Sequence, residues 1–104
     1  MTSKEIYDNL CLFRRSKQLH GIAPQKMKEN GVRMEELPTN KEKDEISNTI
    51  YYGSDGGFVM ESYASYDHSR AFELRPDSNH FQVTLCDKDG NELERDNFVY
   101  WDDE

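Results

Sequence analysis

The spacing of apolar residues changes partway along this chain of 104 residues, and that change limits the fold more than any other feature. The first apolar residues recur at the three- and four-residue spacing of an amphipathic helix: Ile6, Leu10 and Phe13. Thr2 opens an S/T-x-x-E capping pattern before them, and Gly21 follows as a stop signal. The pattern predicts a helix over residues 3–20.

A second, shorter helix is expected next. Pro24 suits the first turn of a helix over residues 25–29, and an Asn-Gly pair ends it. Residues 35–46 then contain Pro38 and few apolar side chains, which predicts an exposed connector.

From residue 47 onward, aromatic and β-branched residues alternate with polar residues, and this two-residue period is typical of strands. Five segments have the pattern: 47–53, 58–65, 71–75, 80–86 and 91–101. Because the turns between them are short enough to join antiparallel neighbours, we expect an α+β fold in a single domain over residues 1–104. The N-terminal helix and the short second helix would pack on an antiparallel β-meander of four to five strands.

The turn before the last segment sets the register of the final hairpin. A three-residue loop pairs Leu85 with Leu93. It also pairs Cys86 with Glu92, whereas a two-residue loop would set Leu85 against Glu94. The first register keeps apolar residues together and predicts a core face of Phe81, Val83, Leu85 and Leu93. By alternation it places three carboxylates on the opposite, outward face: Glu92, Glu94 and Asp96.

Charge is divided unevenly along the chain. Residues 1–34 hold seven Lys and Arg against three Asp and Glu, a net charge of +4, whereas residues 35–104 hold six against 18, a net charge of −12. The domain therefore has a basic helical part (1–34), a connector (35–46) and an acidic sheet (47–104). A division this large concerns partners and electrostatic steering rather than the fold itself.

Residue types that support catalysis or metal binding are present, but not in suitable patterns. Asp87 and Asp89 belong to a D-x-D-G sequence, yet Gly90 stands fourth where a calcium loop needs its glycine sixth, so we interpret both as turn residues. The histidines form no H-x-H or H-E-x-x-H pattern, and Cys11 and Cys86 lie far apart. We expect reduced thiols, no enzyme activity, no metal and no cofactor.

The acidic C-terminal segment is the candidate binding site. Residues 87–104 hold eight of the 21 acidic side chains and the single tryptophan. Tyr and Trp are rigid anchors at interfaces, and carboxylates attract basic surfaces. The residues expected to bind a partner are Glu92, Glu94, Asp96, Tyr100, Trp101, Asp102 and Asp103. An alternative interpretation is that the carboxylates only keep an edge strand solvated and prevent aggregation.

A different pattern lies in residues 13–32, FRRSKQLHGIAPQKMKENGV. It resembles the opening helix pair of phage-type helix-turn-helix repressors, in which a basic helix ends at Gly-apolar and a Gln-containing helix ends at Gly-Val. Lys28 stands where that pattern has a small packed residue, and no third helix is expected before Pro38. Because a net charge of −8 repels phosphate, we do not expect direct nucleic-acid binding. The basic helix face is then either solvated or paired with the acidic sheet: Arg14, Arg15 and Lys17.

These features predict a small acidic inhibitor without catalytic activity. It would bind a basic protein, a nucleic-acid-handling enzyme or complex, by charge mimicry. Small acidic domains of this kind resemble phage or mobile-element anti-defence proteins of the anti-CRISPR or anti-restriction type. The alternatives are a general protein-interaction module and a helix-turn-helix-like regulator. With no apolar run near the roughly 20 residues of a membrane span and no signal-peptide pattern, we expect a soluble protein of the host cytoplasm without a membrane partner.

Overall fold

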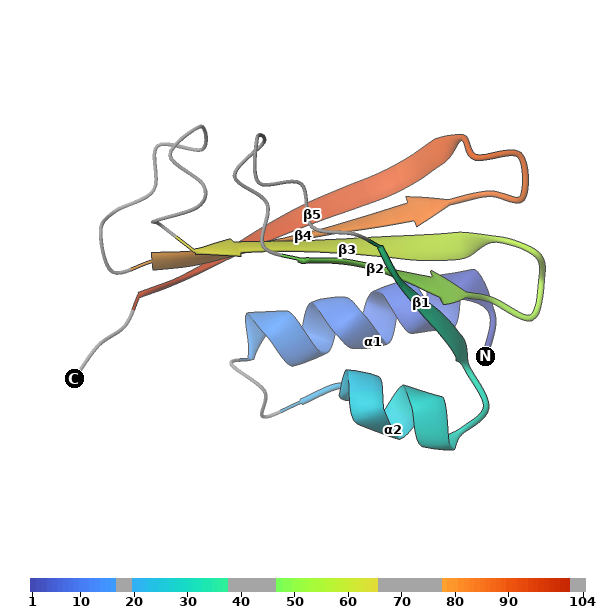
Figure 1. Cartoon of the computed structure of the whole chain (residues 1–104), viewed down its shortest axis with the longest axis horizontal. Helices are drawn as coiled ribbons and strands as arrows, with labels where there is room; N and C mark the ends of the chain where they lie inside the picture. The colour runs from blue at the N-terminus through green and yellow to red at the C-terminus, as the bar shows by residue number, and fades with distance from the viewer. Residues whose placement is uncertain (17–19, 38–46, 66–77, 102–104) are drawn as a thin grey trace.

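The computed structural model describes residues 1–16, 20–37, 47–65 and 78–101. In this part of the chain there are two helices and five strands: α1 (Ser3–Arg15), α2 (Pro24–Glu29), β1 (Arg33–Leu37), β2 (Ser47–Tyr52), β3 (Phe58–Ser65), β4 (Ser78–Cys86) and β5 (Glu92–Trp101). The strands form one antiparallel sheet in the order β1-β2-β3-β4-β5, and both helices lie on one face of it (Figure 1). The predicted α+β fold is confirmed.

Local sequence signals begin α1 at the predicted position. The Thr2 hydroxyl accepts a hydrogen bond from the Glu5 N–H at 3.2 Å, and the Glu5 carboxylate accepts one from the Thr2 N–H at 3.0 Å. This capping box satisfies N–H groups that the first turn leaves without helical partners. The helix ends at Arg15 rather than at residue 20, and at its C-cap the Ser16 hydroxyl donates to the Leu12 carbonyl at 2.6 Å.

The short second helix, α2, is also where the sequence predicts it. Pro24 occupies its first position, and Met27 is its buried residue. The chain turns at Gly31, which has a φ of 87° that favours glycine, and enters β1. A strand therefore follows α2 where a helix-turn-helix protein has its recognition helix.

The first strand, β1, is an element that the sequence pattern did not predict. The expected connector is wrong for residues 35–37, which belong to this strand. Met34 packs against the core, while the opposite face of the strand holds Arg33, Glu35 and the half-buried Leu37. There the Arg33 guanidinium lies 4.1 Å from the centre of the Tyr52 ring, and the Tyr52 hydroxyl donates to Glu35 at 2.9 Å. A strand with a single packed apolar side chain has too weak an alternation to be recognised from sequence.

The other strands follow the expected meander. β3 pairs directly with β4, with Val59 opposite Leu85. The strand predicted over residues 71–75 and the rest of the connector, residues 38–46, lie outside the described residues. The remaining predicted strands correspond to β2, β3, β4 and β5.

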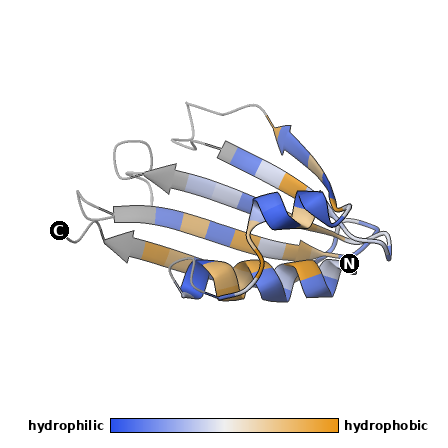
Figure 2. Ribbon diagram, turned by 90° about the horizontal axis from the view of Figure 1, so that it is seen from below, coloured by the Kyte–Doolittle hydropathy of each residue, from blue (hydrophilic) through white to orange (hydrophobic). Residues whose placement is uncertain are grey.

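The core lies between the sheet and the helices. Its fully buried members come from both layers: Ile6, Leu10, Met27, Tyr51, Val59 and Val83. Figure 2 shows α1 running alongside β5 under the β4–β5 side of the sheet, with α2 under the middle strands. The face of the sheet that these helices cover is called the helix-covered face below.

The β4–β5 hairpin departs from the predicted register at one residue. Cys86 pairs with Glu92 as predicted, but Leu85 pairs with Glu94 because the register shifts between Leu85 and Cys86. This β-bulge leaves Leu93 as an extra residue of β5 without a partner in β4. Leu93 is 58% exposed, so its predicted place in the core is wrong. The predicted core positions of the β4 residues are confirmed, with Phe81 partly buried and two buried fully: Val83 and Leu85.

The bulge also turns two carboxylates toward the helices. Leu85 is opposite Glu94 and Val83 is opposite Asp96, and directly opposite residues share a face of the sheet. The prediction that Glu94 and Asp96 point away from the core face is therefore wrong. Both stand near the edge of the helix-covered face, where α1 supplies cations to them.

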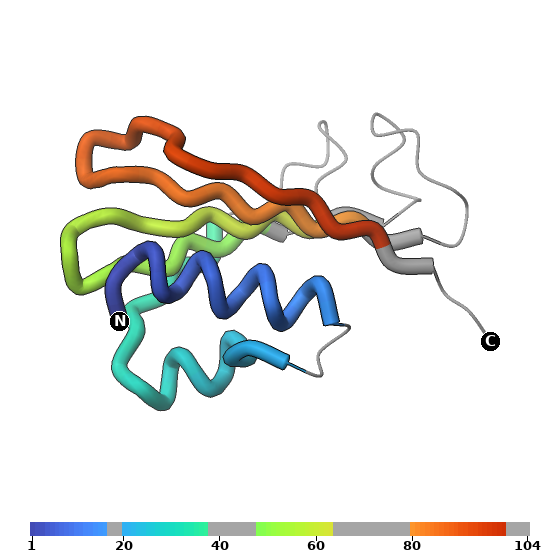
Figure 3. The backbone as a smooth tube through the Cα atoms, turned by 180° about the vertical axis from the view of Figure 1, so that it is seen from behind, coloured from blue at the N-terminus to red at the C-terminus, as the bar shows by residue number. Residues whose placement is uncertain are grey.

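The edge position of β5 is clear from behind. Figure 3 shows β5 along one side of the sheet next to β4, with the β2–β3 and β4–β5 hairpins at the same end as the N-terminus. Among the described residues, no strand pairs with the outer side of β5.

Candidate functional site

A groove runs between α1 and the β5 edge and encloses about 360 Å³. Its lining comes from the outward side of α1 and from two residues of β5: Tyr7, Asp8, Cys11, Leu12, Arg15, Glu94 and Asp96. The α1 members recur at three- and four-residue spacing because one side of a helix returns at that period. The groove thus brings the acidic strand and the basic helix together.

Ion pairs connect the two walls of the groove. The Lys4 ammonium lies 2.6 Å from a Glu94 carboxylate oxygen and 3.2 Å from Asp8. The hydrogen bond with Glu94, followed by that with Asp8, raises the pKa of Lys4. Farther along, the Arg15 guanidinium lies 3.1 Å from Asp96. All of these side chains are solvent-exposed, so the pairs contribute little to stability and exchange partners easily.

The floor of the groove is formed by two buried side chains, Cys11 and Tyr7, that stay protonated. Burial raises the pKa of the Cys11 thiol to about 11, and burial followed by the neighbouring Cys11 raises the pKa of Tyr7. At neutral pH both groups are protonated, and a protonated thiol is a poor nucleophile. Both Cys11 and Cys86 are free thiols, as predicted.

Exposed apolar side chains gather along the same side of the molecule. Among the described residues, the exposed large apolar side chains are Leu12 (45%), Leu93 (58%) and Val99 (40%). Leu12 lines the groove, while Leu93 and Val99 belong to β5. Val99 is opposite His80 and so lies on the face of the sheet away from the helices. Apolar surface therefore flanks the β5 edge on both sides.

Two of the predicted site residues line the groove, and the others are not among its described lining residues. Glu94 and Asp96 line the groove, and Glu92 stands at the bulge, where it accepts a hydrogen bond from Arg95 at 2.8 Å. Tyr100 and Trp101 are the last two residues of β5. Outside the described residues lie Asp102 and Asp103.

Five groove residues were not among the predicted site residues: Tyr7, Asp8, Cys11, Leu12 and Arg15. Their three- and four-residue spacing is visible in the sequence, but the same spacing describes any side of a helix. Only the packing of α1 beside β5 shows that this side borders the acidic strand.

The basic side chains of α1 that the structure describes pair with carboxylates, whether buried or exposed. Arg14 is buried, and its Nε and Nη2 donate to the two carboxylate oxygens of Glu61 at 2.7 and 2.9 Å. The predicted alternative, pairing with the acidic sheet, is therefore correct for Arg14 and for Arg15, which binds Asp96. Lys17 lies outside the described residues.

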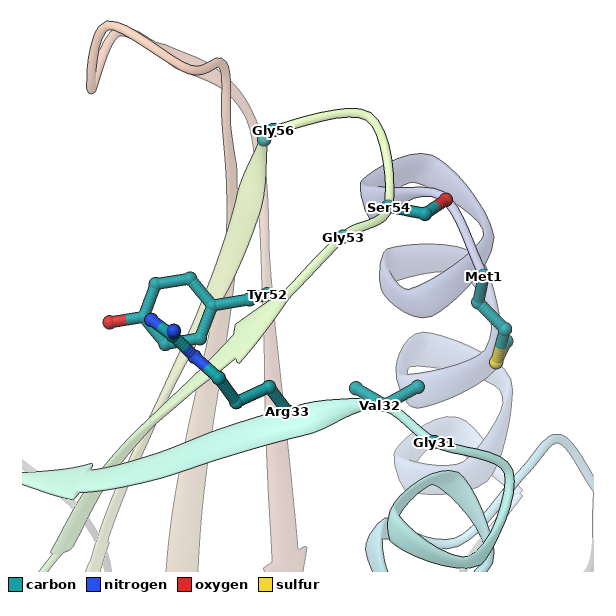
Figure 4. A pocket seen from close by; sticks show the side chains of 9 residues that line it. Met1, Gly31, Val32, Arg33, Tyr52, Gly53, Ser54 and Gly56 are labelled. Atoms are coloured by element: carbon teal, nitrogen blue, oxygen red, sulfur yellow. The ribbon is translucent and has the colours of Figure 1, made fainter.

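A second hollow of about 340 Å³ lies where the N-terminus, the α2–β1 turn and the β2–β3 hairpin meet. Figure 4 shows the Arg33 side chain lying across the Tyr52 ring on one side, with Met1 and Val32 toward α1 on the other. The Met1 carbonyl accepts a hydrogen bond from Ser54 N–H at 2.8 Å. Arg33 and Tyr52 are the titratable side chains in this lining, which contains no Asp, Glu, His or Cys.

The D-x-D-G sequence forms a turn, as predicted. Asp87 accepts hydrogen bonds from the N–H groups of Asp89 and Asn91, both at 2.9 Å, and from the Asn91 side chain at 3.0 Å. The Asn91 contacts lower the pKa of Asp87. Within the described residues, no group of three His, Cys, Asp or Glu side chains is arranged to hold a metal ion.

Across the described part of the chain, no helix is both long and apolar enough to cross a membrane. Comparison with protein-family models, with curated proteins and with solved structures gives no match to this chain.

Proposed function

We propose that this chain is a small acidic binding protein without catalytic activity, and that it binds a basic partner along β5. One observation carries the proposal: the unpaired edge of β5, the two groove carboxylates and the exposed apolar side chains occupy one side of the described molecule. Interfaces combine a few apolar anchors with surrounding polar groups, and this side offers both.

The ion pairs of the groove are compatible with such binding. Because Lys4 and Arg15 hold Glu94 and Asp96 in exposed pairs, cations of a partner can take their places at little cost. The chain's net charge of −8 also accelerates the approach of a basic surface.

The partner class that we propose is a nucleic-acid-handling protein. Glu94 and Asp96 are two residues apart and share one face of β5, which separates their Cα atoms by about 6.6 Å. Such a row of carboxylates can compete with backbone phosphates for a groove lined by Lys and Arg. Binding there would inhibit the partner. An anti-defence role for a phage or mobile element, against a CRISPR or restriction enzyme, is the finer form of this proposal and rests on the acidic composition alone.

Competition with DNA tests the proposal. The tagged chain is used to capture its partner at low salt, and the purified partner is then loaded with a fluorescent DNA duplex. The chain should displace the duplex, and the Glu94→Lys/Asp96→Lys variant should need at least about tenfold more protein to do so.

A matched variant distinguishes the effect of the β5 carboxylates from the effect of net charge. Glu29→Lys/Glu36→Lys makes the same change in net charge on exposed residues of α2 and β1, near the opposite edge of the sheet. It should displace the duplex as well as the parent chain. Equal losses in both double variants would mean that net charge alone attracts the partner, and an undisturbed duplex would contradict nucleic-acid mimicry.

A general protein-interaction module is the second candidate, favoured by the exposed Leu12, Leu93 and Val99. It predicts a partner whose binding withstands high salt and leaves bound DNA in place, because apolar contacts are not screened by ions.

A further inference from the structure

The outer side of β5 presents an unpaired row of backbone groups. β5 is a ten-residue strand at the end of the strand order, so its outward N–H and C=O groups have no partner strand among the described residues. Such an edge is a template on which another extended segment can form a ladder of main-chain hydrogen bonds.

The two faces beside this edge differ in chemistry. On the helix-covered face, an added strand would lie next to Glu94 and Asp96 and above the groove wall formed by Leu12. On the other face it would lie next to Arg95, Asn97 and Val99, with Leu93 exposed at the bulge. Because side chains of a strand alternate between faces, an incoming strand would meet Glu94 and Asp96 at every second residue, and Arg95, Asn97 and Val99 at the residues between.

We propose that β5 accepts an extended segment of the basic partner as a sixth strand, with Lys or Arg facing the groove and uncharged residues, such as Val, on the opposite face beside Arg95 and Val99. This inference rests on the proposed function, because it specifies how the basic partner is held. Main-chain hydrogen bonds supply the attachment, and the alternating side chains supply the selectivity.

The groove suits Lys and Arg better than shorter cations. The aliphatic stem of either side chain can lie along Leu12 and the buried Tyr7, while its charged end reaches Asp8, Glu94 or Asp96. Lys4 and Arg15 would leave their present carboxylates and become solvated, as their exposed positions allow.

Charge argues against a second copy of this chain as the occupant. Each copy carries a net charge of −8, and edge-to-edge pairing of two β5 strands would bring the two rows of carboxylates together. Charged side chains on an edge strand are a common protection against such self-pairing. A basic strand meets no such repulsion.

The test uses synthetic peptides of defined pattern and the whole chain. A labelled peptide of alternating Lys and Val should bind, whereas a peptide of the same composition with all Lys before all Val should bind at least about tenfold more weakly. Backbone N-methylation provides the sharper comparison. One peptide is methylated at every Lys and another at every Val, and only one of the two should lose binding, because alternate N–H groups of an edge strand point to the same side.

Amide hydrogen exchange locates the peptide on the protein. Alternate N–H groups of β5 should become protected when the alternating peptide is added, while β1, the other edge of the sheet, serves as the internal control and should not change. Protection of β1 instead would overturn the assignment to β5.

The remaining outcomes separate this inference from the proposed function. If all basic peptides bind equally whatever their order and methylation, while Glu94→Lys/Asp96→Lys still weakens them, the partner is basic but strand addition is wrong. If an alternating Thr–Val peptide binds as well as the Lys–Val peptide, strand addition stands and the preference for a basic partner fails. A stable dimer of the free chain in sedimentation, dissociated by Val99→Lys, would show that a second copy occupies the edge and would overturn the inference.

Discussion

At the scale of single residues, Glu61 is the carboxylate most enclosed by the described fold. It accepts two hydrogen bonds from Arg14 and a third from the Tyr51 hydroxyl at 3.0 Å, and the Arg14 guanidinium lies 4.0 Å from the centre of the Phe81 ring. Burial, followed by the charge of Glu61, raises the pKa of Tyr51. A buried ion pair is stable only when both charges keep their hydrogen bonds. The Arg14–Glu61 pair therefore fixes the position of α1 on the sheet.

The Glu61→Gln variant tests that requirement. It keeps the size of the side chain but removes the negative charge that faces the buried Arg14, so the free energy of unfolding should fall by about 3 kcal/mol. Urea denaturation measures the change. As comparisons, Tyr51→Phe removes one hydrogen bond and should cost about 1.5 kcal/mol, whereas replacing Arg14 by Met and Glu61 by Leu together should be close to neutral. A Glu61→Gln protein as stable as the parent would contradict the account.

At the scale of whole elements, Asp55 fastens the start of α1 to the β2–β3 hairpin. Its carboxylate accepts hydrogen bonds from the N–H and the hydroxyl of Ser3, both at 3.0 Å. The close approach also explains Gly53, where an added Cβ would lie 2.4 Å from the Ser3 nitrogen. The helix and the hairpin are therefore held together at one end of the sheet.

The same contact predicts an acid dependence. The hydrogen bond from the Ser3 backbone, chiefly, lowers the pKa of Asp55 in the folded state. Asp55 therefore stabilises the fold above its unfolded pKa of about 4, and this contribution is lost as the pH falls through the lower folded value. The melting temperature of Asp55→Asn should fall less than that of the parent between about pH 6 and about pH 3. Glu29→Gln controls for the loss of one negative charge. Identical acid profiles for Asp55→Asn and the parent would show that the contact does not contribute.

Elements that form through contacts between near neighbours in the sequence can be predicted from it, whereas elements that depend on distant contacts cannot. Thr2 and Glu5 are near neighbours, so the start of α1 can be recognised locally. β1 cannot be recognised locally, because Met34 is its main contact with the core and the strand lies at the edge of the sheet. The predicted register of β5 fails at Leu93 because a β-bulge shifts the pairing between Leu85 and Cys86. Matching apolar residues across the hairpin assumes an uninterrupted ladder, so it does not reveal a bulge.

At the scale of the whole molecule, the basic and acidic parts of the chain fold against each other. Within α1, the basic residues Lys4, Arg14 and Arg15 are directed at carboxylates of the sheet rather than forming a separate basic surface. The sequence predicts the candidate acidic strand but not the groove, whose α1 wall depends on this packing. The exposed ion pairs thus have two roles that can be separated: they join the helix to the edge, and they hold carboxylates that a partner can use.

A charge swap separates the two roles. Exchanging both exposed pairs, Lys4→Glu with Glu94→Lys and Arg15→Glu with Asp96→Lys, leaves the net charge at −8 and allows both ion pairs to form in reverse. The thermal melt should stay close to that of the parent, because exposed pairs contribute little and the two pairs with β5 are restored, although the Lys4–Asp8 pair is lost. Partner association at low salt should slow by about tenfold or more, since the edge of β5 now presents cations to a basic surface.

Raising the salt concentration should narrow this difference, because screening weakens both the attraction and the repulsion. If the swapped protein associates at the parent's rate, the overall charge attracts the partner and β5 has no special part in it. If the melt collapses while the rate is lost, the pairs are structural, and the effect on binding cannot be assigned to the edge.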